Sequence, residues 1–147
     1  MATVRLSFSP APAHVRTARL VGVAVARRAG VAEELLDEVR LAIGEACSRA
    51  VALHQRYGLT DLVTVEMTDD PGYMVQVTDR APAIEAVRAL PDTTAGVVPD
   101  GLSEEAVTAG MALALLTGLV DELRVRPAPE GPGTEVQMIW PAWRQGR

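Results

Sequence analysis

The chain of 147 residues contains no lysine and no asparagine, and all 14 of its basic residues are arginines. A phosphate-binding P-loop is therefore excluded, because that motif needs a lysine that reaches the phosphates. The single cysteine, Cys47, has no partner for an internal disulfide. With only two histidines beside it, the usual ligand set of a structural zinc site is also missing.

Long hydrophobic runs and an excess of positive charge are absent as well. No apolar stretch reaches the roughly 20 residues that cross a membrane, and the N-terminus shows no charged segment followed by an apolar run. We therefore expect a cytoplasmic protein with no membrane partner. The net charge of −5 argues against a nucleic-acid partner, since phosphate backbones are bound by clustered cations. At 48% hydrophobic residues, the composition predicts one globular domain over residues 1–147.

The spacing of apolar residues predicts a short strand at residues 4–8 and then two helices. The first helix covers about residues 13–28 and stops at Gly30, and the second covers about residues 32–57 and stops at Gly58. One stripe of the second helix is apolar and contains Leu36, Val39, Ile43, Ala46, Cys47, Ala50 and Leu53. The opposite side is charged and contains Glu38, Glu45, Arg49 and Arg56. Cys47 is therefore predicted to be a packed core thiol, and His54 a helix-end residue.

The second half of the chain predicts two hairpins with a helix between them. Strands are expected at residues 62–67, 73–78, 120–126 and 135–140, and a buried helix at residues 110–119. The segment of about residues 80–109 is rich in proline and glycine, which is typical either of a mobile functional lid or of a disordered loop. This order of elements predicts a two-layer α/β sandwich, with a mixed, mostly antiparallel sheet and its helices on one face.

Four short motifs follow one another along the chain: Glu45-Ala-Cys-Ser-Arg49-Ala-Val, Asp79-Arg-Ala81-Pro-Ala83, Gly110-Met111-Ala112-Leu113 and Gly133-Thr134. They resemble, in order, the N box, the two glycine boxes and the final Gly-Thr of the GHKL ATPases. Within that superfamily the chain is most similar to the anti-sigma-factor serine kinases of the RsbW and SpoIIAB type, as a degenerate member. The resemblance implies the GHKL (Bergerat) fold and nucleotide contacts from Arg49, Asp79, Ala81, Ala83, Gly110, Met111, Ala112, Leu113 and Thr134.

The N box departs from the family pattern at the residue that would ligate the metal. The resemblance makes Glu45 the candidate general base, but Arg49 stands where family members use an asparagine oxygen to ligate magnesium. A guanidinium has only donors and stays protonated. At about 4 Å it would repel Mg²⁺ by roughly 8 kcal/mol at an effective dielectric near 20. We therefore expect magnesium to be excluded, although ATP itself stays a possible ligand.

Two further readings of this helix face stay open. Arg49 follows Glu45 by one helical turn, in the favourable order for an ion pair that would make Glu45 a poor base. The bland alternative is an ordinary solvated face of charged residues.

The glycine boxes are altered too. The resemblance gives Asp79 the role of binding the adenine amino group, although a strand-ending turn residue explains it equally well. Ala81 and Ala83 replace two glycines, and a left-handed backbone at either position would cost roughly 1–2 kcal/mol. Ala112 also replaces a glycine, whereas Gly110 keeps its place at a helix start, where free amides can bind an anion. Gly133 and Thr134 are explained as well by a hairpin turn.

The first predicted helix carries a candidate partner surface. Arg19 lines up with an arginine that family members use to contact partners, and Arg16 lies one turn earlier on the same face; two solvated arginines are the alternative. The resemblance implies a sigma factor, a STAS-domain anti-anti-sigma factor and a homodimer. Trp140 and Trp143 either anchor a partner or cover a sheet edge.

Together these features predict an anti-sigma-like regulatory protein that acts by partner switching, with a degenerate ATP site. One alternative is an active ATP-dependent serine protein kinase that phosphorylates the anti-anti-sigma factor. Another is a nucleotide sensor in which Arg49 takes the place of the metal.

Overall fold

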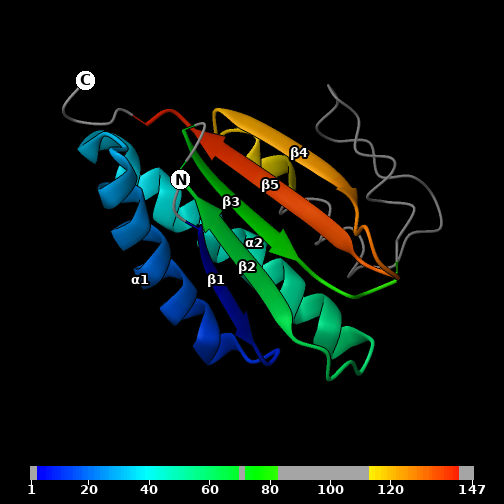
Figure 1. Cartoon of the computed structure of the whole chain (residues 1–147). Helices are drawn as coiled ribbons and strands as arrows, with labels where there is room; N and C mark the ends of the chain where they lie inside the picture. Colours follow the sequence, from blue (N-terminus) through cyan, green and yellow to red (C-terminus); the bar gives the residue numbers. More distant parts are fainter. Residues whose placement is uncertain (1–2, 70–71, 83–112, 143–147) are drawn as a thin grey trace.

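The computed structural model describes residues 3–69, 72–82 and 113–142, which form one sheet with two long helices packed on it (Figure 1). The elements are β1 (Thr3–Phe8), α1 (Pro12–Ala29), the 3-10 turn η1 (Glu33–Leu35), α2 (Leu36–Arg56), β2 (Val63–Thr68), β3 (Tyr73–Thr78), β4 (Glu122–Pro127) and β5 (Thr134–Trp140). Residues 113–116 add a short helical turn. Of the predicted lid, only residues 80–82 belong to the described part of the chain.

The helix α1 begins and ends where its sequence signals predict. Pro12 occupies its first turn, where a missing N–H costs nothing. At the other end Gly30 has a φ of 93°, and the amide of Val31 donates to Ala26 O at 3.0 Å. This left-handed glycine closes the helix as expected.

The helix α2 confirms the predicted apolar stripe and alters the charged face. Every member of the stripe is buried, and Cys47 is a core thiol as predicted. Glu33–Leu35 form a 3-10 turn, so the α-helix proper begins at Leu36. Arg49 and His54 are also buried. The prediction of a solvated face around Arg49 is therefore wrong.

The strand order of the sheet is β1-β2-β3-β5-β4. All four pairings between the described strands are antiparallel, so this part of the sheet contains no parallel pair. The two helices explain why β1 and β2 are antiparallel. The helix α1 runs back along β1, α2 runs in the direction of β1 again, and β2 then starts at the end of the sheet where β1 stopped. Tight connections explain β2–β3 and β4–β5.

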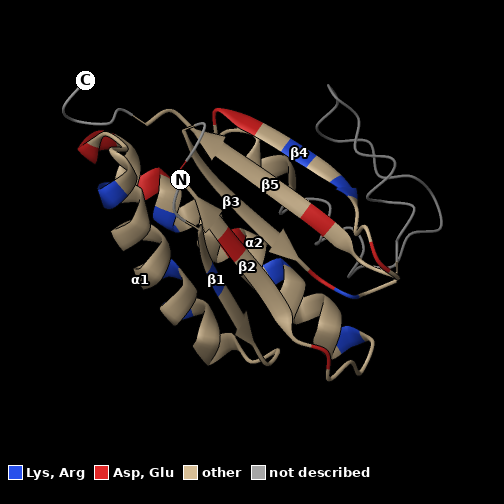
Figure 2. Cartoon of the chain, in the orientation of Figure 1, with Lys and Arg blue, Asp and Glu red and all other residues tan. Residues whose placement is uncertain are grey.

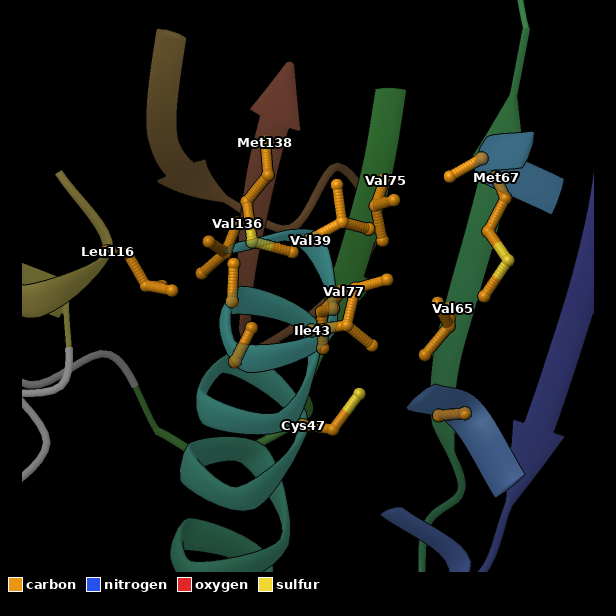
Figure 3. Packing of buried hydrophobic residues seen from close by; sticks show 14 of the residues in the cluster. Val39, Ile43, Cys47, Val65, Met67, Val75, Val77, Leu116, Val136 and Met138 are labelled. Carbon is orange, nitrogen blue, oxygen red and sulfur yellow. The ribbon is translucent and has the colours of Figure 1, made fainter. Parts of the chain in front are cut away.

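The core lies between α1, α2 and one face of the sheet (Figures 1 and 3). In β2 and β3 every second residue is fully buried and points at the helices, as one-sided packing requires. Figure 3 shows side chains of this set between the strands and the helices; they include Val65, Met67, Val75 and Val77. No helix among the described residues is long and apolar enough to cross a membrane.

Trp140 belongs to this core. It lies on the inner strand β5 with 1% of its surface exposed, stacks on Tyr73 at a ring-centroid distance of 5.9 Å, and donates from Nε1 to Leu119 O. Both interpretations of Trp140, a partner anchor and a cover for a sheet edge, are therefore wrong. Trp143 lies outside the described residues.

Candidate functional site

The centre of the candidate site is a buried ion pair between Arg49 and Asp79. Arg49 lies on α2, and Asp79 follows directly after the last residue of β3. Because α2 packs across this strand, the Arg49 Nη1 atom comes within 3.1 Å of Asp79 Oδ2. The two side chains are only 1% and 2% exposed. The sheet and α2 thus bring together residues from the first two motifs.

Asp79 is held from several directions. Its Oδ1 atom accepts a hydrogen bond from the Ala81 amide at 3.0 Å, and its own amide donates to Thr134 O at 3.0 Å. Gly133, at a φ of 128°, lies so close to the Asp79 carbonyl oxygen that a Cβ atom there would collide with it. Both carboxylate oxygens of Asp79 are therefore already engaged by the protein.

His54 supports the same region and was missed by the sequence analysis. Its Nε2 atom accepts a hydrogen bond from the Arg80 amide at 2.8 Å, so the ring proton is on Nδ1, which donates to Asp61 O at 3.0 Å. The ring thereby ties the end of α2 to the chain after β3. A signal was available, since His54 lies seven residues after Cys47 and continues the apolar stripe.

Burial and mutual attraction act in opposite directions on the ion pair. Burial raises the pKa of the Asp79 carboxyl, and the Arg49 charge and the Ala81 amide oppose that rise. Burial likewise lowers the pKa of Arg49, opposed by Asp79. The ordinary pKa of a guanidinium is high enough to keep Arg49 charged despite this.

Arg49 still has donors without acceptors. Its Nε and Nη2 atoms are buried and have no hydrogen-bond partner. An unsatisfied buried donor costs about 1–3 kcal/mol. The two groups lie on one edge of the guanidinium, the fork that binds two-oxygen anions such as carboxylates and phosphates.

The expected ion pair between Arg49 and Glu45 is wrong, and the condition for a cost at Ala81, a left-handed backbone, is not met. The ion pair of Arg49 goes to Asp79, and no ion pair joins Arg49 to the half-buried Glu45 among the described residues. Ala81 carries no backbone strain, because only glycines adopt a positive φ in the described ranges. The replacement of a glycine by Ala81 therefore has no conformational cost here.

The remaining predicted site residues lie in different places. Thr134 is buried, and its backbone carbonyl accepts the hydrogen bond from the Asp79 amide. Leu113 is fully buried in the core. Arg16 and Arg19 are exposed on α1. Four predicted residues lie outside the described part of the chain: Ala83, Gly110, Met111 and Ala112.

Comparison with known protein families shows which family this chain belongs to. The histidine kinase-like ATPase domain matches residues 8–140, nearly the whole chain. The chain belongs to this family. The match supports the predicted GHKL-type fold and ATP binding as the property of the family. A comparison with curated proteins finds no match.

Magnesium-bound ATP is the group that this ATPase family implies, and the residues of the site do not fit it. Arg49 offers only donors where a metal needs oxygen ligands. The Asp79 carboxylate is already bound by Arg49 and Ala81. The site therefore departs from the family's chemistry at its charged centre.

Proposed function

We propose that this histidine kinase-like ATPase domain is an anti-sigma-like regulatory protein that works by partner switching. It binds a sigma factor, a STAS-domain anti-anti-sigma factor or each in turn, as a homodimer, and its ATP site is degenerate. The subtype rests on the resemblance of the four sequence motifs to the anti-sigma serine kinases. The observation that supports a loss of ATP chemistry is the buried Arg49–Asp79 pair.

The ion pair works against nucleotide binding in the family's manner. For Asp79 to bind an adenine amino group, its carboxylate must release Arg49, which would stay buried without a counter-charge. Separating a buried pair in this way costs about 3–5 kcal/mol. That cost weakens ATP binding by about a hundredfold or more. Transfer of phosphate to a partner is then lost or slow.

The surface of α1 supports protein binding. This helix carries four arginines and no acidic residue, although the chain as a whole has a net charge of −5 (Figure 2). Arg16 and Arg19 are exposed there and make no ion pair within the described ranges. A cationic helix face of this kind favours an acidic partner surface and speeds its encounter.

Purified components test the proposal. Each STAS-domain protein and each sigma factor of the source organism is tested separately for binding by biolayer interferometry, without nucleotide. We expect at least one to bind, and Arg19→Glu to weaken that binding about tenfold or more. The control is Arg124→Glu, a charge reversal at an exposed arginine of β4, far along the sheet from α1, which also removes the exposed ion pair of Arg124 with Glu122. Binding to none of these proteins would refute the proposal.

The alternative of an active serine kinase is tested in the same system. Transfer of phosphate from millimolar ATP and Mg²⁺ to a serine of the bound STAS protein, abolished by Glu45→Ala, would replace our proposal with the kinase. We expect no transfer.

One observation favours a second function, a metal-independent nucleotide sensor. The Nε and Nη2 atoms of Arg49 lack acceptors, and a phosphate could supply two oxygens to them. Calorimetric titration with ADP, with and without a chelator, decides this. Equal affinity in both conditions, lost in Arg49→Met, supports the sensor, whereas no binding excludes it.

A further inference from the structure

Gly44, in the middle of α2, faces Arg19 of α1 across the contact between the two helices. A Cβ atom at position 44 would lie 3.0 Å from Arg19 Cδ and 3.3 Å from Arg19 Nε. The three atoms nearest to that position all belong to Arg19. The missing side chain of Gly44 therefore forms a notch that accommodates the stem of this arginine.

Helix packing alone does not explain this glycine. Gly22 lies at the same helix–helix contact, and there a Cβ atom would collide with the core side chain of Ile43. Gly22 thus serves the close packing of the core. At Gly44 the three nearest atoms belong instead to an arginine that is exposed at the surface. Glycine is among the poorest helix formers, so its presence here needs a reason other than helix stability.

The notch fixes where the Arg19 charge lies. The aliphatic stem of Arg19 lies across α2 rather than extending into solvent. Its charge reaches Cys47, one helical turn after Gly44, where it opposes the rise that burial gives to the pKa of the thiol. Arg19 makes no ion pair or hydrogen bond within the described ranges. The stem of Arg19 is therefore seated against Gly44, and its charge has no acidic partner within the described ranges.

We propose that Gly44 is a positioning residue that seats Arg19 to receive an acidic side chain of a protein partner. This inference rests on the proposed function, in which α1 contacts the partner. An arginine already held in its bound position loses less side-chain entropy when the partner binds. Arg27 of α1 pairs with Glu33, but Arg16 and Arg19 have no acidic partner within the described ranges, which makes an acidic group the complementary chemistry.

A double-mutant cycle between Gly44→Ala and Arg19→Ala tests the proposal. The measured quantities are the affinity for the STAS protein or sigma factor that binds the wild type, and the melting temperature. Alanine is the better helix former, and the flexible Arg19 stem can move aside. We therefore expect Gly44→Ala to melt at or above the wild-type temperature while binding about tenfold more weakly. On the Arg19→Ala background it should weaken binding no further.

The outcomes separate this inference from the proposed function. If Arg19→Ala weakens binding but Gly44→Ala binds like the wild type, the positioning role is wrong and the partner surface stands. An equal loss from Gly44→Ala with and without Arg19 also overturns the positioning role, because the effect would not pass through Arg19. If the wild type captures no partner, both proposals fail. Ser48→Ala, at an exposed position one turn later on α2, controls for a general change in the helix and should leave binding unchanged.

Discussion

Arg49 and Asp79 form a buried ion pair that joins the middle of α2 to the end of β3, with 3.1 Å between Nη1 and Oδ2. This pair lies where the first two of the four sequence motifs meet. Its two charges are satisfied mainly by each other. Under the proposed function, the pair links the stability of the domain to a loss of ATP chemistry.

Removal of one member of the pair should destabilise the protein strongly. We expect Asp79→Ala to lower the free energy of unfolding by about 3–5 kcal/mol, because Arg49 would be left charged and buried. Arg49→Met combined with Asp79→Ala should lose less than the sum of the single variants, since no isolated charge remains. Urea unfolding measures all three. Strictly additive losses would show that the two residues do not act as a pair.

The two histidines should differ in their effect on stability. His54→Ala leaves the Arg80 amide and the Asp61 carbonyl without partners and removes a fully buried ring. We expect a loss of about 2–4 kcal/mol in the free energy of unfolding. His14→Ala, at an exposed position on α1, is the control and should change it by less than about 0.5 kcal/mol. Equal effects of the two substitutions would contradict the role given to His54.

Stability should fall at alkaline pH through Cys47. Burial raises the pKa of its thiol to about 12 from an ordinary value of 9.0, so the unfolded chain loses this proton first as the pH rises. The stabilisation is complete below about pH 9 and is lost progressively up to about pH 12, at up to about 1.4 kcal/mol per pH unit. Burial also raises the pKa of Tyr73, which adds to the loss at the upper end of this window.

Urea unfolding at pH 8.5 and pH 10, in the presence of a reductant, measures this effect. We expect the free energy of unfolding to fall by about 1 kcal/mol between these values. In Cys47→Ala the decline over this interval should be smaller. An identical decline in the wild type and the variant would remove Cys47 as the cause.

Gly133 should be much less replaceable than Gly131, although both have a positive φ. An alanine at position 131 would meet no atom within 4 Å, so Gly131→Ala should cost only the left-handed backbone, about 1–2 kcal/mol. At position 133 the added Cβ would collide with the backbone of Asp79. We expect Gly133→Ala to cost at least about 2 kcal/mol more, measured by urea unfolding. Similar costs at both positions would mean that this contact does not fix Asp79.

Much of the fold could be predicted because its signals are local. The period of the apolar residues placed α1, α2 and the strands within a few residues, and Gly30 marked a helix end that the structure confirms. The 3-10 turn before α2 was not predicted, since the same apolar spacing suits either kind of helix. The antiparallel pairing of β1 with β2 depends on how α1 and α2 route the chain, which the pattern of residues does not specify.

The site could be predicted only in part because its contacts are non-local. The motifs correctly drew attention to Arg49 and Asp79, but i, i+4 spacing favoured Glu45 as the partner of Arg49. A buried carboxylate thirty residues further along the chain competes better, because two buried charges need each other more than a half-exposed pair does. His54 was missed because its helix-end position concealed its place in the apolar stripe.

The central claim is that the Arg49–Asp79 pair has replaced magnesium-dependent nucleotide binding. Calorimetric titration of ATP and ADP, with and without Mg²⁺, against the wild type and Arg49→Asn tests it most directly. The account predicts no magnesium-dependent affinity in the wild type and a gain of such affinity in Arg49→Asn, in which Asp79 is released and an oxygen ligand is restored. Tight, magnesium-dependent ATP binding by the wild type would contradict it.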